Sequence, residues 1–211
     1  MNVGILGSGD VARALAAGFL SRGHHVMLGT RDAAKLQEWR ESAGERASVG
    51  SFLQAARFGD LVVLATHGMS TVEILEGIGD SAVAGKTVID ATNPLRAGTG
   101  GPELAIGFTD SLGERIQRAI PSAHVVKCYN TVGNALMIDP KVIGGPPDMF
   151  VAGNDDAAKR AVTAIVTDFG WNVVDLGGIE QSRLLEPLCM VWVLHGARSG
   201  QWNHAFKFLH T

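Results

Sequence analysis

A short glycine-rich segment near the N-terminus has the residue types and spacing needed to hold phosphate groups. The segment reads Gly7-Ser8-Gly9-Asp10-Val11-Ala12. It follows an apolar stretch, residues 3–6, and opens a stretch with the periodicity of an amphipathic helix. Gly7 allows a tight turn, Gly9 lets the backbone approach a pyrophosphate, and Ala12 lets the helix pack closely on the strand. Because amide groups at a helix N-terminus attract anions, the pattern predicts a dinucleotide site.

The end of the next expected strand indicates which dinucleotide is bound. That strand, residues 25–28, is followed by Thr30 and Arg31, with Lys35 close behind. An NAD site usually has an acidic residue here, which hydrogen-bonds the ribose 2′-hydroxyl. A hydroxyl and two cations instead suit a 2′-phosphate, so the sequence predicts NADP(H). Two alternatives stay open: the cations could be solvated surface charges, and Asp32 could cap a helix or support NAD.

The composition limits the class of protein. The chain has 211 residues, 46% of them hydrophobic, with 27 glycines and a formal net charge of -3. This length suits one well-buried domain with a small appendage. The weak negative charge and scattered cations predict no nucleic-acid partner. The longest apolar run, residues 188–194, is too short to span a bilayer, and the first strand leaves no room for a signal peptide. We therefore expect a cytoplasmic protein without a membrane segment.

The two cysteines, Cys128 and Cys189, both lie in apolar stretches. Neither belongs to a CxxC pair, so neither a disulfide framework nor a metal site is predicted. Both are expected to be small buried hydrophobic residues.

Expected strands and helices alternate along most of the chain. The strands are expected at residues 3–6, 25–28, 47–49, 61–66, 87–91, 125–129, 149–152 and 172–175. This alternation predicts an α/β fold with a Rossmann-type, doubly wound and mainly parallel sheet over residues 1–178. Residues 93–110 are rich in Gly and Pro, lack periodicity, and are predicted to form a long loop.

The last part of the chain, residues 179–211, breaks the alternation and is predicted to form a short helical appendage. Residues 182–194 are apolar almost all round a helix, which must therefore be buried against its own sheet or a partner subunit. A second short helix is expected to carry Trp202, Phe206 and Leu209. A homodimer through the C-terminal helix is favoured, and a core helix explains the composition as well.

The strand ends that should face the bound nucleotide contain few proton donors. They comprise Ala65-Thr66-His67, Asp90-Ala91-Thr92-Asn93-Pro94 and Asn130-Thr131-Val132-Gly133. In an open parallel sheet, ligands bind beyond the carboxyl ends of the strands. His67 is the one candidate catalytic acid or base there. Alternatively, His67 is a loop histidine that is hydrogen-bonded within the protein, or it contacts the ribose.

The position of the only tyrosine also limits which class of reductase the chain can belong to. Short-chain reductases protonate an alkoxide with a Tyr-x-x-x-Lys pair, but here Gly133 stands four residues after Tyr129. Hydride exchange between a nicotinamide and another flat redox ring needs chiefly stacking at the right distance and exclusion of water. A shallow cleft of small residues can provide both, so this class of reaction is favoured.

Several segments together resemble a known family. They read GILGSGDVARALAAGFLSRGHHVMLGTRD, DATNPL, KCYNTVGNALM, GGIEQSRLLEPL and WNHAFKFL. Over essentially the whole chain they look like the NADPH-dependent reductases of the deazaflavin coenzyme F420, in their bacterial branch. The cytosolic reductase domains of membrane metalloreductases are similar in the same way.

The resemblance implies hydride transfer between NADPH and F420 across the C-terminal edge of the sheet. It implies pyrophosphate contacts from Ser8, Gly9, Asp10 and Val11. It implies 2′-phosphate contacts from Thr30, Arg31 and Lys35. It implies nicotinamide-ribose contacts from Ala65, Thr66 and His67. The second ring would be bordered by Asn93, Pro94, Thr131 and residues 206–209.

The chain departs from the archaeal members of this family at residues 66–68, at Asn93 and in a more elaborate loop, residues 98–110, over the expected acceptor site. These departures leave other acceptors open: a flavin, a quinone, or a small imine or carbonyl compound. A protein that senses NADP without catalysis is a third class of function.

Overall fold

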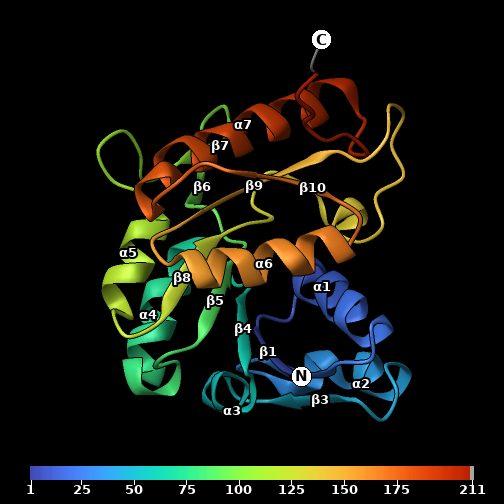
Figure 1. Ribbon diagram of the computed structural model, residues 1–211, viewed down its shortest axis with the longest axis vertical. Helices are drawn as coiled ribbons and strands as arrows, with labels where there is room; N and C mark the ends of the chain where they lie inside the picture. Colours follow the sequence, from blue (N-terminus) through green and yellow to red (C-terminus); the bar gives the residue numbers. More distant parts are fainter. Residues whose placement is uncertain (210–211) are drawn as a thin grey trace.

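The computed structural model describes residues 1–209 and contains an eight-stranded sheet with helices on both faces (Figure 1). The strands are β1 (Asn2–Leu6), β2 (His25–Gly29), β3 (Ala47–Gly50), β4 (Leu61–Leu64), β5 (Thr87–Asp90), β8 (His124–Lys127), β9 (Asp148–Gly153) and β10 (Asn172–Asp175). Their spatial order is β10-β9-β8-β5-β4-β1-β2-β3. Neighbours from β3 to β8 are parallel, whereas β9 runs antiparallel to β8 and parallel to β10. The predicted Rossmann-type, mainly parallel sheet is confirmed.

Two hydrophobic cores lie on opposite faces of this sheet. The helices are α1 (Asp10–Ser21), α2 (Gln37–Ser42), α3 (Phe52–Phe58), α4 (Gly68–Ile78), α5 (Leu112–Ala119), α6 (Asp156–Asp168) and α7 (Ser182–Ser199). Short 3₁₀ turns are η1 (Ala33–Leu36), η2 (Asp80–Ala82), η3 (Asn134–Leu136) and η4 (Ile179–Gln181). One core joins α1 and α6 to the sheet, and the other joins α3, α4 and α5. In β4, Val63 belongs to the first core and Val62 and Leu64 to the second, as strands covered on both faces require.

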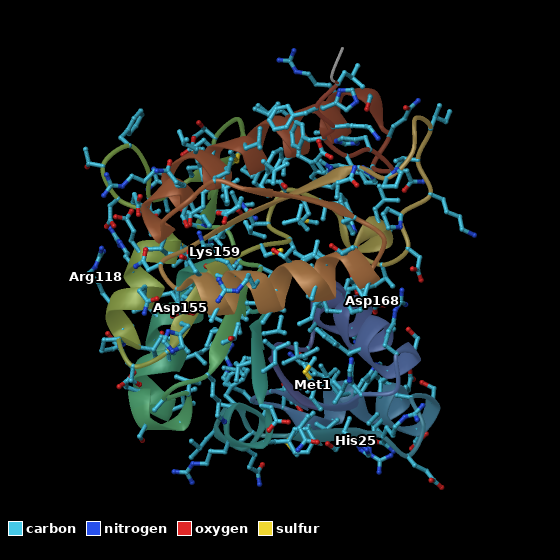
Figure 2. The ribbon with its side chains drawn as sticks, in the orientation of Figure 1. Met1, His25, Arg118, Asp155, Lys159 and Asp168 are labelled. Carbon is cyan, nitrogen blue, oxygen red and sulfur yellow. The ribbon has the colours of Figure 1, made fainter. Side chains whose placement is uncertain are left out.

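Three helices begin at side-chain caps. The hydroxyl of Ser51 accepts from the Gln54 amide at 3.2 Å, and the Gln54 side chain accepts from the Ser51 amide at 2.7 Å. This capping box fixes the start of α3. Ser111 and Asp155 cap α5 and α6 in a similar way. Asp155 and Asp168 mark the two ends of α6 in Figure 2.

The C-terminal helix α7 covers β9 and β10 at the edge of the sheet farthest from β3 (Figure 1). Its residue Leu185 packs in a small core with Phe150 and Ala152. Its opposite side exposes Leu184 and Val191, which are 63% and 56% exposed. The single chain therefore buries one face of this apolar helix and leaves the other uncovered.

The segment predicted as one long loop contains regular structure. An antiparallel hairpin joins β6 (Leu95–Gly98) to β7 (Gly101–Leu104). Most residues of the hairpin are exposed, so the apolar alternation that identifies a half-buried strand is missing from its sequence. The prediction that residues 93–110 have no secondary structure is wrong for this reason.

The predicted second helix at the C-terminus is also wrong. Residues 201–209 have no regular secondary structure, and residues 210 and 211 of the predicted appendage lie outside the described part. The Asp148 amide donates to the Phe206 carbonyl at 2.9 Å, and the Phe208 amide donates to Asp148 Oδ2 at 2.6 Å. These bonds to the start of β9 replace the local bonds of a helix. Within residues 1–209, no helix is long and apolar enough to cross a membrane.

Candidate cofactor site

A cleft of about 490 Å³ opens beyond the carboxyl ends of β1, β2 and β4. Among its lining residues are Gly7, Ser8, Gly9, Asp10, Val11, Thr30, Arg31, Lys35, Ala65, Thr66 and His67. All of these were candidate binding residues in the sequence. The cleft is also lined by Asp32, Phe52, Ser70, Ile74 and Asn134. Three segments far apart in the chain thus meet at one edge of the sheet, as the fold requires.

The glycine turn owes its path to two backbone positions. Gly7 has φ +149°, and a Cβ on it would overlap the carbonyl oxygen of Ala65. Its amide donates to the Gly29 carbonyl at 3.0 Å, which ties the turn to the end of β2. Gly9 has nothing within 4 Å of where a Cβ would stand, so the backbone there is open to a ligand.

The N-terminus of α1 faces this cleft without a protein cap. Gly9 is its N-cap residue, and no side chain accepts a hydrogen bond at this cap. The first turn of α4, which follows His67 on the other side of the cleft, also has no side-chain cap. The capped helices α3, α5 and α6 differ in this respect. Two helix N-termini with uncapped amides make the cleft suitable for an anionic ligand.

The acidic residue after β2 is engaged with the backbone. Oδ1 of Asp32 accepts from the Ala34 amide at 3.1 Å and caps η1. The buried hydroxyl of Thr30 accepts from the Asp32 amide at 3.1 Å, so it shapes the same turn. Arg31 and Lys35 are exposed and line the cleft beside them. This end of the cleft therefore presents two cations, while its carboxylate already has a backbone donor.

The other end of the cleft is formed by the loop after β4. His67 is exposed, and its carbonyl accepts from the Ser70 amide at 2.9 Å. A Cβ on Gly68 would overlap the backbone oxygen of Asn93, so the loops after β4 and β5 are in close backbone contact. His67 is the one titratable side chain that lines this end, among the residues the structure describes.

Three predicted site residues lie beside the cleft and do not line it. The amide of Asn93 donates to the Asn130 carbonyl at 2.8 Å, and the Asn130 amide donates to Asn93 Oδ1 at 3.0 Å. Pro94 and Thr131 are buried. These residues connect the ends of β5 and β8, so a direct contact with a second substrate stays a prediction.

The loop expected over the acceptor site lines a different depression. Ile106 and Phe108, together with Leu184 and Pro187 of α7, border a mainly apolar groove of about 750 Å³. No residue of 98–110 lines the cofactor cleft.

Below the cleft edge, a buried ionic network joins α7 to the sheet. The ammonium of Lys127 lies 2.6 Å from Asp90 Oδ2 and 3.0 Å from Glu186 Oε1. Glu186 also accepts from the amides of Leu112 and Gly113 at the start of α5, at 3.0 and 2.9 Å. Burial lowers the pKa of Lys127, but the two carboxylates outweigh it and hold that pKa above its usual value. Lys127 therefore stays charged.

Other residues near the site gave weaker signals in the sequence. Asn134 lies in η3 and reaches the cleft from a loop with no recognisable motif. Lys127 interrupts an apolar strand, and a single charged residue in such a strand indicates that it has a buried partner of opposite charge.

Cys128 and Cys189 are both buried and free, which confirms the prediction that they are small buried residues. Burial raises the pKa of the Cys189 thiol to about 11.

The chain is similar to several known proteins. A family model described as "NADP oxidoreductase coenzyme F420-dependent" matches residues 2–94. The crystal structure of a putative F420-dependent NADP-reductase from Arthrobacter sp. FB24 is 38% identical, covers 99% of both chains and superposes with a TM-score of 0.92. The F420-dependent NADP reductase of Methanothermobacter marburgensis is 26% identical over 89% of this chain and 89% of its own.

Metalloreductase STEAP3 of Rattus norvegicus is 25% identical over 88% of this chain. The present chain spans only 36% of the length of that metalloreductase. The family is shown by the match at 38% identity over nearly the whole chain. The Rossmann sheet and the glycine turn that leads into the uncapped helix α1 agree with it. The chain belongs to the coenzyme F420-dependent NADP oxidoreductase family.

Proposed function

We propose that this protein binds NADP(H) in the cleft beyond β1, β2 and β4 and transfers a hydride between it and a deazaflavin or flavin-like acceptor. The observation that carries the proposal is the pairing of an uncapped α1 N-terminus with two exposed cations, Arg31 and Lys35, along one cleft. A pyrophosphate would lie at the N-terminus of α1, and a 2′-phosphate would lie between Arg31 and Lys35.

Preference for the phosphorylated dinucleotide is supported by the turn after β2. An NAD site usually presents a carboxylate to the ribose 2′-hydroxyl, whereas here one oxygen of Asp32, Oδ1, accepts from the Ala34 amide and caps η1. Arg31 and Lys35 supply two cations, which favour a phosphate dianion. Thr30 holds this turn through its bond with the Asp32 amide.

The nicotinamide would lie at the end of the cleft formed by Ala65, Thr66 and His67. When bound, the nucleotide supplies the hydride, and the protein needs to orient it and exclude water. The loop after β4 and Asn134 border this end from two sides. The Thr66 hydroxyl lies 2.7 Å from that of Thr71, which fixes the loop after β4 at this end of the cleft.

A flat redox ring is the acceptor class that these groups suit. The side chains at this end are small or neutral except for His67, so a reaction that requires a built acid–base pair is poorly supported. F420 itself is proposed on the basis of the family. FMN, FAD or a quinone is the same class of acceptor.

A small imine or carbonyl compound is a second candidate, and the exposed His67 in the cleft favours it. His67 or a bound water would then supply the proton. His67→Ala should in that case lower the rate and remove a limb of its pH profile, whereas an unchanged rate and profile would contradict this role.

The direct experiment mixes purified protein with NADPH and F420 and follows the absorbance of F420 at its maximum. We expect bleaching with NADPH and much slower bleaching with NADH. Parallel reactions contain FMN or FAD. Absence of turnover with all three acceptors would contradict the proposal, and NADPH binding without turnover would favour a sensor.

We also propose an organisation for the chain. Residues 1–178 would form the NADP-binding domain, and residues 179–211 an appendage that packs on it and joins two copies into a cytoplasmic homodimer. The exposed apolar side of α7, formed by Leu184, Val191 and Leu194, supports this arrangement. Such a surface on a helix is typical of a subunit contact.

A further inference from the structure

Arg13, in the first turns of α1, connects two parts of the cleft that are distant in the sequence. Its Nε donates to the carbonyl of Ser8 at 3.2 Å. Its Nη2 donates to the carbonyl of Lys35 at 3.0 Å. The side chain itself does not line the cleft. One guanidinium thus bridges the glycine turn and the segment that carries the second cation of the 2′-phosphate end.

The segment that carries Lys35 is fixed by other contacts chiefly at its two ends. It is the four-residue 3₁₀ turn η1, and such turns have poor hydrogen-bond geometry. Asp32 caps its start, and Leu36 at its end is buried. Between them, the Lys35 carbonyl has the Arg13 guanidinium as its partner from another element. The Arg13 bridge therefore ties the part of this segment that carries Lys35 directly to the glycine turn.

We propose that Arg13 is a positioning residue that gives the site its preference for NADP(H) over NAD(H). The inference rests on the proposed use of the cleft for NADP(H). By holding the Lys35 carbonyl at a fixed place relative to Ser8, Arg13 sets the spacing between the pyrophosphate end and the 2′-phosphate end. A nucleotide without the 2′-phosphate makes no use of this spacing.

Geometry makes arginine suited to this role. The planar guanidinium presents several N–H groups in a fixed fork, so Nε and Nη2 can serve two carbonyls at once. The single ammonium of a lysine keeps the charge but lacks the fork. Arg13→Lys therefore separates the bridge from the long-range effect of the charge.

The experiment measures equilibrium binding of NADPH and NADH through their nicotinamide fluorescence, so it needs no acceptor. We expect Arg13→Ala and Arg13→Lys each to weaken NADPH binding by about tenfold, and to change NADH binding by less than about threefold. Arg40→Ala, which removes an exposed cation five residues after Lys35, is the charge control and should leave the ratio of the two affinities unchanged.

A double-mutant cycle tests the path of the effect. In a Lys35→Ala background, Arg13→Ala should cause no further loss of preference, because Arg13 acts by placing the Lys35 ammonium, which this background lacks. Equal weakening of both nucleotides, an unchanged NADPH affinity, or a full additional loss in the Lys35→Ala background would each overturn the inference. If Arg13→Ala does not fold, Arg13→Lys in the same cycle decides the question. Failure of the unmutated protein to bind NADPH would instead contradict the proposed function.

Discussion

The ammonium of Lys127 lies 2.6 Å from Oδ2 of Asp90, and neither side chain has any exposed surface. Asp90 is the last residue of β5, and Lys127 the last of β8. The Thr92 carbonyl accepts a further bond from Lys127 at 2.9 Å, which fixes the chain just before Asn93. The ion pair thus holds two strand ends together at the edge of the sheet where the cleft opens.

Replacement of Lys127 by Met should lower the free energy of unfolding by about 3–5 kcal/mol, because Asp90 and Glu186 would be left buried without their cation. Urea unfolding measures the loss. Lys141→Met, at an exposed position, is the control and should change stability by less than about 0.5 kcal/mol. A similar small effect at both positions would show that the buried charges find other partners.

Arg31→Ala should weaken NADPH binding by about one to two decades and NADH binding far less, because a charge-assisted contact with a phosphate is worth about 1.5–3 kcal/mol. Calorimetric titration with both nucleotides measures the difference. Equal losses would place Arg31 among the ordinary surface charges. Arg57→Ala, on the exposed side of α3, serves as the matched control.

Gly68→Ala should destabilise the protein by about 1–3 kcal/mol, because the added Cβ overlaps the backbone oxygen of Asn93. Gly77→Ala is a control in the same helix, because nothing lies within 4 Å of its Cβ position. Alanine stabilises a helix interior by up to about 1 kcal/mol relative to glycine. Thermal unfolding should therefore move in opposite directions for the two variants. Equal shifts would show that the two loops can separate without cost.

Acid should remove a contribution to stability at Asp110. Burial raises the pKa of this carboxyl, but Arg118, Arg115 and the Ser111 amide outweigh it and lower the pKa from 3.8 to about 2. Because the folded pKa is depressed, the contribution is fully present well above pH 3.8 and is lost as the pH falls toward 2. Asp110→Asn should lower stability at neutral pH and make the unfolding temperature less sensitive to pH in this window. Partial exposure and salt screening keep the effect small.

Val191→Glu should favour monomers if α7 joins two copies, since the substitution puts a charge in the middle of the exposed apolar stripe. Sedimentation velocity of the two proteins over a range of concentrations measures this. Ala161→Glu, on the exposed side of α6, should leave the association unchanged. Identical sedimentation of Val191→Glu and the unmutated protein would remove α7 from the contact.

Residues near one another in the chain could be assigned from the sequence. The glycine turn and the cations after β2 are local patterns, and the structure brings both to one cleft. The hairpin of β6 and β7 was not predicted, because most of its residues are exposed and its sequence has no apolar alternation. A helix was wrongly predicted in residues 201–209, because hydrogen bonds with Asp148 replace the local bonds of a helix there.

The sequence alone determined the fold class and the phosphate-binding turn, since both follow from periodicity and from what small residues allow in the backbone. Only the tertiary structure decided which remote groups meet. Glu186 reaches Lys127 from another element, and the Arg13 guanidinium reaches the backbone carbonyl of Lys35. Electrostatic and hydrogen-bond contacts depend on distances of a few ångströms, and distances between remote segments arise only when the chain has folded.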